Sequence, residues 1–72
     1  MSHIPAYKEV YSKLKEELKE GIYPAGSLLP TESELEKIFH VSRTTIRKAI
    51  SILSLEGYVK TKQGYATEVL NI

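Results

Sequence analysis

The first twenty residues place apolar side chains at intervals of three and four, with polar or charged residues between them. This spacing predicts an amphipathic helix, because an α-helix turns about every 3.6 residues and so gathers such positions on one face. Pro5 suits the opening turn, and Gly21 stands where a left-handed C-terminal cap is common. We expect this helix near residues 6–20, with an apolar face formed by Tyr7, Val10, Tyr11, Leu14, Leu18 and Ile22.

A second helix is predicted at residues 32–39, after a turn with a proline and a glycine and a stub of strand at residues 28–29. Thr31 and Glu34 have the spacing of a capping box, in which each side chain satisfies a backbone N–H group at the helix start. His40 and Val41 then interrupt the helical pattern, which predicts a tight turn. The buried edge of the second helix is expected to consist of Leu35, Ile38 and Phe39.

A third helix is indicated over residues 43–55 by four apolar residues at positions i, i+3, i+4 and i+7, namely Ile46, Ala49, Ile50 and Leu53. Ser42 is the expected N-cap, and Val41 is expected to pack on Ile46 as a hydrophobic staple. Such a helix buries one side and presents the other to solvent. The presented side carries Arg43, Thr44, Arg47, Lys48 and Ser51.

The remaining residues predict a β-hairpin over residues 58–70, which we call the wing. Gly57 ends the third helix, and segments 58–61 and 66–70 are rich in β-branched and aromatic residues around Gly64. Three helices, a tight turn between the second and third, and a terminal hairpin make a winged helix-turn-helix, an α+β fold that is mainly α. The 72 residues suffice for one domain, residues 1–72, with a single small core.

Composition excludes several classes of protein. The chain has no cysteine and no aspartate, and its only imidazoles are His3 and His40. No catalytic spacing and no phosphate-binding glycine loop occurs, so we expect no enzyme, cofactor or metal site. We interpret the glutamates mainly as partners of lysines on helix surfaces. Because no run of about 18 apolar residues and no export signal is found, we expect a cytoplasmic protein without a membrane segment.

Charge is distributed unevenly along the chain, although the net charge is only +1. Residues 1–42 hold five lysines and seven glutamates, a net charge of −2. Residues 43–62 carry a net charge of +4, from Arg43, Arg47, Lys48, Lys60 and Lys62 against Glu56. A basic stretch that covers one helix and the hairpin after it favours an anionic partner such as nucleic acid, the alternative being a face that is only solvated.

Four short motifs then follow one another in a fixed order. They are GIYPAG at residues 21–26, LPTESEL at residues 29–35, VSRTTIRKAI at residues 41–50 and LSLEG at residues 53–57, with Gln63, Gly64 and Thr67 after them. Together they resemble the N-terminal domain of GntR-type bacterial transcriptional regulators, over nearly the whole chain. The resemblance implies a dimeric, ligand-responsive repressor or activator whose third helix enters the major groove of double-stranded DNA while the wing reaches the minor groove.

The same resemblance implies partners beyond these residues. We expect a homodimer that reads a pseudo-palindromic operator, with each domain on one half-site. A small-molecule effector is expected to act through a C-terminal effector-binding domain that is absent from this chain. The chain is therefore expected to be the DNA-binding piece of a longer regulator.

Candidate DNA contacts on the third helix begin with Arg43 and Arg47, which lie one turn apart. Each guanidinium has a planar fork that can hold guanine O6 and N7 or grip a phosphate. The hydroxyl and N–H groups at a helix start suit a phosphate anion, which makes Ser42, Thr44 and Thr45 candidates. Four of these residues have structural alternatives. Arg43 and Arg47 could each be an exposed arginine in a surface ion pair. Ser42 could serve only as a cap, and Thr45 only in packing or capping.

Further candidates lie on the third helix, on the second helix and in the wing. Lys48 is expected to point toward solvent and to reach the DNA backbone, or to be a plain solvated lysine. Ser33 is a weaker phosphate contact at a position where many family members carry a basic residue. In the wing, Lys62 would serve phosphates, Gln63 would reach the minor-groove floor, and Gly64 would either permit a close approach or serve only the turn. A second departure from the family is Tyr65-Ala66, where many members have a glycine and a basic residue.

The alternative to DNA binding is a winged helix that binds another protein, because one fold can serve both functions. A protein-binding version would present aromatic or aliphatic anchors on the exposed side of the third helix. That side instead carries arginine, threonine and lysine, although Ile52 and Leu55 near its end favour the alternative.

Overall fold

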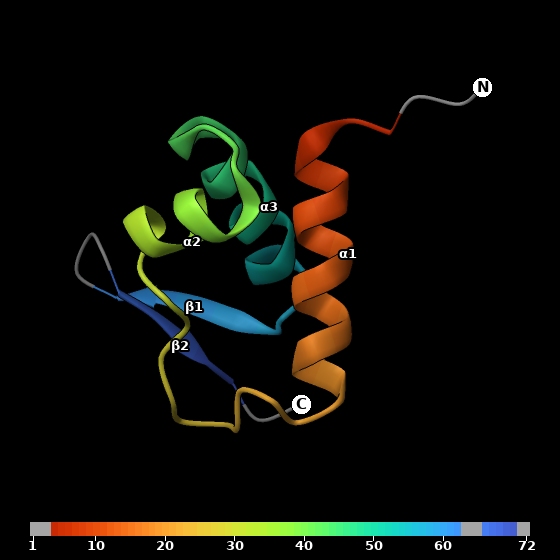
Figure 1. The fold of residues 1–72 in the computed structure, drawn as a ribbon. Coiled ribbons are helices and arrows are strands. Elements are labelled where there is room, and N and C mark those ends of the chain that lie inside the picture. Colours follow the sequence, from red (N-terminus) through yellow and green to blue (C-terminus); the bar gives the residue numbers. More distant parts are fainter. Residues whose placement is uncertain (1–3, 63–65, 71–72) are drawn as a thin grey trace.

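The computed structural model describes residues 4–62 and 66–70, and within these ranges it has three helices followed by a two-stranded hairpin (Figure 1). The helices are α1 (Ala6–Lys19), α2 (Glu32–Phe39) and α3 (Arg43–Leu55). The strands are β1 (Val59–Lys62) and β2 (Ala66–Val69). This order of elements is that of the predicted winged helix-turn-helix, which is confirmed. No helix in the described ranges is long and apolar enough to cross a membrane.

One hydrophobic core holds the helices and the hairpin together. α1 lies along α3, and the hairpin lies below α2 and α3 (Figure 1). The predicted apolar stripe of α3 is fully buried, and Leu14 of α1 reaches it from the other side with no exposed surface. Burial of such a side chain stabilises the fold by about 1.5–3 kcal/mol. The core consists of Val10, Leu14, Leu18, Leu29, Leu35, Ile46, Ala49, Ile50, Leu53, Val59 and Val69.

Two apolar residues expected in the core are instead exposed. Ile38 of α2 is 57% exposed, because this helix has only eight residues and packs through Leu35 and Phe39. Ile22 is 55% exposed, because Gly21 has a φ of 80° and turns the chain away from the axis of α1. A helical repeat predicts burial only while the helix continues and has a neighbour on that side.

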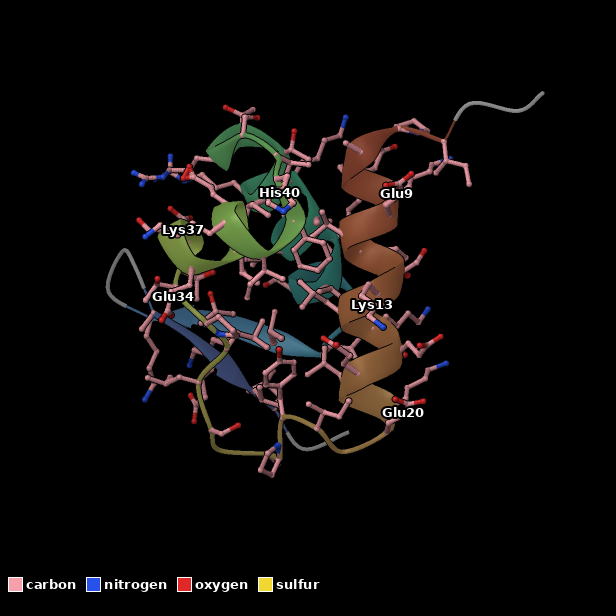
Figure 2. All side chains as sticks on the ribbon, viewed as in Figure 1. Glu9, Lys13, Glu20, Glu34, Lys37 and His40 are labelled. Atoms are coloured by element: carbon pink, nitrogen blue, oxygen red, sulfur yellow. The ribbon has the colours of Figure 1, made fainter. Side chains whose placement is uncertain are left out.

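A tight turn at residues 40–42 joins α2 to α3. His40 adopts the left-handed conformation with φ 56°, and its N–H group donates to the carbonyl of Glu36 at 2.8 Å, which caps α2. Ser42 follows as the N-cap of α3, as predicted. The capping box of α2 is also confirmed, since Thr31 N–H donates to Glu34 Oε1 at 2.8 Å and Glu34 N–H donates to Thr31 Oγ1 at 3.2 Å. Figure 2 shows Glu34 at the beginning of α2 and His40 at its end.

Strand β2 is hydrogen-bonded on both of its edges. β1 and β2 pair antiparallel, with Val59 opposite Val69 and Lys62 opposite Ala66. On the other edge of β2, the N–H group of Leu29 donates to the carbonyl of Thr67 at 2.9 Å, and the N–H group of Val69 donates to the carbonyl of Ser27 at 2.8 Å. The predicted stub at residues 28–29 thus pairs with β2 and fixes the base of the wing.

Candidate nucleic-acid interface

The side of α3 opposite its buried stripe is open to solvent. Arg43, Thr44, Arg47, Lys48 and Ser51 are all exposed, as their positions off the apolar stripe predict. Because the stripe is anchored in the core, these side chains project from a fixed backbone. The helix therefore offers cations and hydroxyl groups on one surface.

The beginning of α3 is organised by Ser42 and Thr45. Ser42 Oγ accepts the N–H group of Thr45 at 3.3 Å and lies 3.1 Å from Thr45 Oγ1. Both residues thus take part in capping, and Thr45 is half-buried. The N–H groups of Arg43 and Thr44 precede the first internal hydrogen bonds of the helix, where an anion can be bound.

Arg43 lies against α2. Its Nη2 donates to Ser33 Oγ at 3.1 Å. Its Nε lies 3.5 Å from Glu36 Oε2 and 3.9 Å from Glu32 Oε1. The Arg43 side chain still has 50% of its surface exposed. The guanidinium is therefore held by three groups of α2 while its outer edge faces solvent.

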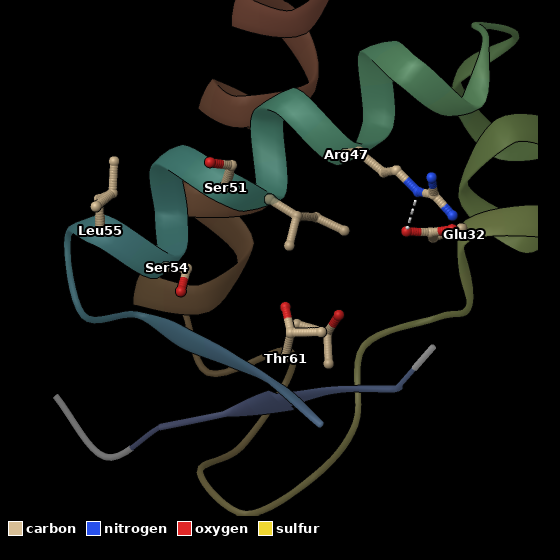
Figure 3. A pocket seen from close by; sticks show the side chains of 8 residues that line it. Glu32, Arg47, Ser51, Ser54, Leu55 and Thr61 are labelled. Carbon is tan, nitrogen blue, oxygen red and sulfur yellow. Dashed lines mark hydrogen bonds and ion pairs between the residues drawn. The ribbon is translucent and has the colours of Figure 1, made fainter. Parts of the chain in front are cut away.

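Arg47, one turn later, shares one of these carboxylates. Its Nε donates to Glu32 Oε2 at 2.9 Å, and the arginine side chain is 61% exposed (Figure 3). This hydrogen bond, together with the negative charge of Glu32, raises the pKa of Arg47 above the ordinary arginine value. We call Glu32, Ser33, Glu36, Arg43 and Arg47 the arginine–glutamate cluster. Its two cations and two anions balance.

The sequence did not predict the partners of these arginines. Among the described residues, three of the five ion pairs join Glu32 or Glu36 to an arginine of α3. The interpretation of the glutamates as partners of lysines is therefore wrong for Glu32 and Glu36. The available signal was their spacing of four residues, which puts both carboxylates on one face of a helix that a tight turn folds against α3.

A groove of about 410 Å³ separates the second half of α3 from the hairpin. Arg47 and Glu32 lie at one end and Leu55 at the other, with Ser51 and Ser54 above and Thr61 of β1 below (Figure 3). Hydroxyl groups on both walls can donate to an anion or accept from a donor. The groove thus connects the exposed side of α3 with the wing.

Lys48 is exposed, as expected, and it also contacts an aromatic ring. Its Nζ lies 4.2 Å from the centre of the Tyr7 ring, a cation–π contact between α3 and the beginning of α1. This contact orients the ammonium group at the edge of the α3 surface. From the sequence, Tyr7 is expected only on the apolar face of the first helix.

The wing contributes two lysines to the described residues. Lys62 Nζ lies 3.6 Å from Glu68 Oε1 on the paired strand, and the Lys62 side chain is 54% exposed. Lys60 lies opposite Glu68 in the register of the hairpin. Gln63 and Gly64 lie outside the described residues, so their proposed contacts stay predictions.

Comparison with known proteins places these features in a family. The family model described as bacterial regulatory proteins, gntR family, matches residues 6–69. The "Probable fructoselysine utilization operon transcriptional repressor" of Escherichia coli K12 is 44% identical over 68 residues, which are 94% of this chain and 28% of the relative. The "Exu regulon transcriptional regulator" of the same strain is 37% identical over 65 residues, 90% of this chain and 25% of the relative. The chain thus spans between a quarter and a third of each relative's length.

A solved structure with the same fold contains DNA. The DNA-binding domain of AraR, crystallised in complex with operator ORR3, has a TM-score of 0.89 and is 37% identical to this chain. The match covers 94% of this chain and 82% of that one. The family model spans the chain from the beginning of α1 to the end of β2, and so the chain belongs to the GntR family of bacterial regulatory proteins, with the winged helix-turn-helix fold.

Proposed function

We propose that this domain binds double-stranded DNA in a sequence-specific manner, with α3 in the major groove and the wing at the minor groove. The observation that carries the proposal is the surface of α3. Its apolar stripe is buried, and two arginines with a threonine between them stand exposed on the other side. The structural similarity to a domain crystallised with its operator supports this use of the surface.

Each part of the surface has a proposed role. Arg47 reads a base edge, since an arginine fork matches guanine O6 and N7 and a good bidentate contact discriminates by about 1–3 kcal/mol. Arg43 contacts a second base or a phosphate. Thr44 and the N–H groups at the beginning of α3 bind a phosphate, with Ser42 and Thr45 shaping that end. Lys48, held over Tyr7, adds a contact to the DNA backbone.

The groove between α3 and the hairpin is proposed to receive the sugar–phosphate strand that separates the two DNA grooves. Ser51, Ser54 and Thr61 supply hydroxyl donors along it. Lys62 and Gln63 then contact the strand and the minor-groove floor, with Gly64 permitting a close approach. Ser33 contributes less than a basic residue would, because its hydroxyl is neutral; this hydroxyl accepts a hydrogen bond from Arg43 and can still donate its own hydrogen to a phosphate.

The whole protein is proposed to be a cytoplasmic transcriptional repressor, as the name of one relative suggests. Two copies would bind a pseudo-palindromic operator as a homodimer, with a small-molecule effector acting through a further domain. The short share of each relative that this chain spans is consistent with such a domain. The proposed activity is binding and involves no catalysis, cofactor or metal.

Chemical-shift mapping with duplex DNA tests this proposal. We expect the amide signals of residues 42–48 to shift on titration with a mixed-sequence duplex, and the shifts to shrink as salt is raised. Signals around Lys13, on the side of α1 away from α3, serve as the internal control (Figure 2). If α3 stays silent while another surface responds, the proposed interface is wrong.

A second candidate function is binding to another protein, and one observation favours it. Leu55, at the end of α3, has 85% of its surface exposed. An exposed leucine can anchor a protein interface, but a single apolar residue among serines gives a small patch. Binding to random duplex DNA that does not depend on salt, or no binding at all, would favour this second function.

A further inference from the structure

The arginine–glutamate cluster has no net charge, although it sits where the proposed function requires cations. Among the residues that the structure describes, Glu32 forms ion pairs with both arginines, whereas Glu36 forms one only with Arg43. Glu36 is 29% exposed, so its carboxylate lies near the surface that DNA would approach. The charge of Glu36 also acts on Arg47 at longer range, so a change at Glu36 is assigned to Arg43 by repeating it in an Arg43→Ala background.

Glu36 and Ser33 fix the orientation of the Arg43 guanidinium, but the interaction is weak. Glu36 and Ser33 occupy the Nε and Nη2 sides of the guanidinium, which are the donors of a bidentate fork. Ion pairs at such exposure shift an equilibrium by only about two- to fivefold. A well-placed acceptor on DNA can therefore displace Glu36, whereas a poorly placed phosphate gains little by doing so.

We propose that Glu36 competes with DNA for Arg43 and thereby weakens binding to random DNA more than binding to the operator. The inference rests on the proposed function. Binding to random DNA depends on phosphate neutralisation, so an arginine that is already neutralised contributes less to it. A guanine at the correct position in the operator offers two acceptors, O6 and N7, so Arg43 can form both hydrogen bonds of a bidentate contact. Glu36 is thus a specificity residue that acts through Arg43.

The test compares Glu36→Gln with Glu16→Gln, which removes the same charge from an exposed position on α1. Salt-dependent titrations use a random duplex and a duplex selected from a random library by the wild-type domain. We expect Glu36→Gln to tighten binding to the random duplex roughly two- to fivefold and to steepen its log–log salt slope by about 0.9, the value for one more neutralised phosphate. The selected-to-random affinity ratio should fall. Glu16→Gln should leave the slope and the ratio unchanged.

A second background shows whether the effect passes through Arg43. In Arg43→Ala, the further change Glu36→Gln should alter neither the salt slope nor the affinity ratio. Equal behaviour of Glu36→Gln and Glu16→Gln, while the wild type binds DNA in a salt-dependent way, overturns the inference and leaves the proposed function standing. A wild type that binds neither duplex with salt dependence overturns the proposed function and this inference with it.

Discussion

Replacement of Arg47 by alanine separates base reading from general attraction to DNA. Arg47 is 61% exposed, so loss of its bond to Glu32, which solvent screens, should change the free energy of unfolding little. The lost base contact should cost about 1–3 kcal/mol of binding, or about a 5- to 150-fold loss of affinity. The variant should therefore fold normally and bind the selected duplex far more weakly.

The assay is fluorescence anisotropy with the selected duplex and with duplexes changed at one base pair at a time. Arg47→Ala should lose its preference at one base pair and retain the others. Arg47→Lys keeps the charge but lacks the fork, so its salt slope should match the wild type while the preference at that base pair is lost.

The structure requires one control for this experiment. Without Arg47, the carboxylate of Glu32 would face DNA and part of the loss could come from repulsion. The double variant Arg47→Ala with Glu32→Gln removes that charge, and the preference should still be absent. If Arg47→Ala ranks all the altered duplexes as the wild type does, Arg47 does not read a base.

Three further predictions concern single contacts. Lys62→Ala should weaken binding to all duplexes alike and reduce the salt slope by about one unit, and a change in base preference would contradict a phosphate contact. Ser42→Ala should lower the free energy of unfolding by about 0.5–2 kcal/mol in urea titrations, because the N-cap bond to Thr45 is lost; unchanged stability would refute this role. Tyr7→Leu should remove the aromatic ring and release Lys48, which should weaken binding to all duplexes by about two- to fivefold. No additional loss is expected when Lys48 is already alanine.

The fold could be predicted from the sequence because its signals are local. The stripe of Ile46 and Leu53 fixes the buried side of α3, and Thr31 and Ser42 mark the helix starts through bonds to residues three positions later. The predicted burial of Ile38 was wrong. Its burial depends on whether a neighbouring element covers that side of α2, which the spacing along one helix does not specify.

The candidate surface could be predicted only in part, for a similar reason. Exposure of Arg43 and Arg47 follows from their positions off the stripe, but their partners lie 10 and 15 residues earlier along the chain. The contact of Lys48 with Tyr7 likewise joins two helices. Which exposed charges meet across a turn depends on the angle between helices, and that angle is set by the packed core.

The hydrogen bonds on both edges of β2 have a mechanical consequence. Residues 27–29 hold one edge and β1 holds the other, while Val59 and Val69 are packed into the same core as α3. The base of the hairpin and the third helix therefore cannot tilt independently. Any signal that reorients this domain would move α3 and the hairpin together. The proposed contacts with the two DNA grooves would therefore be gained or lost in a single step.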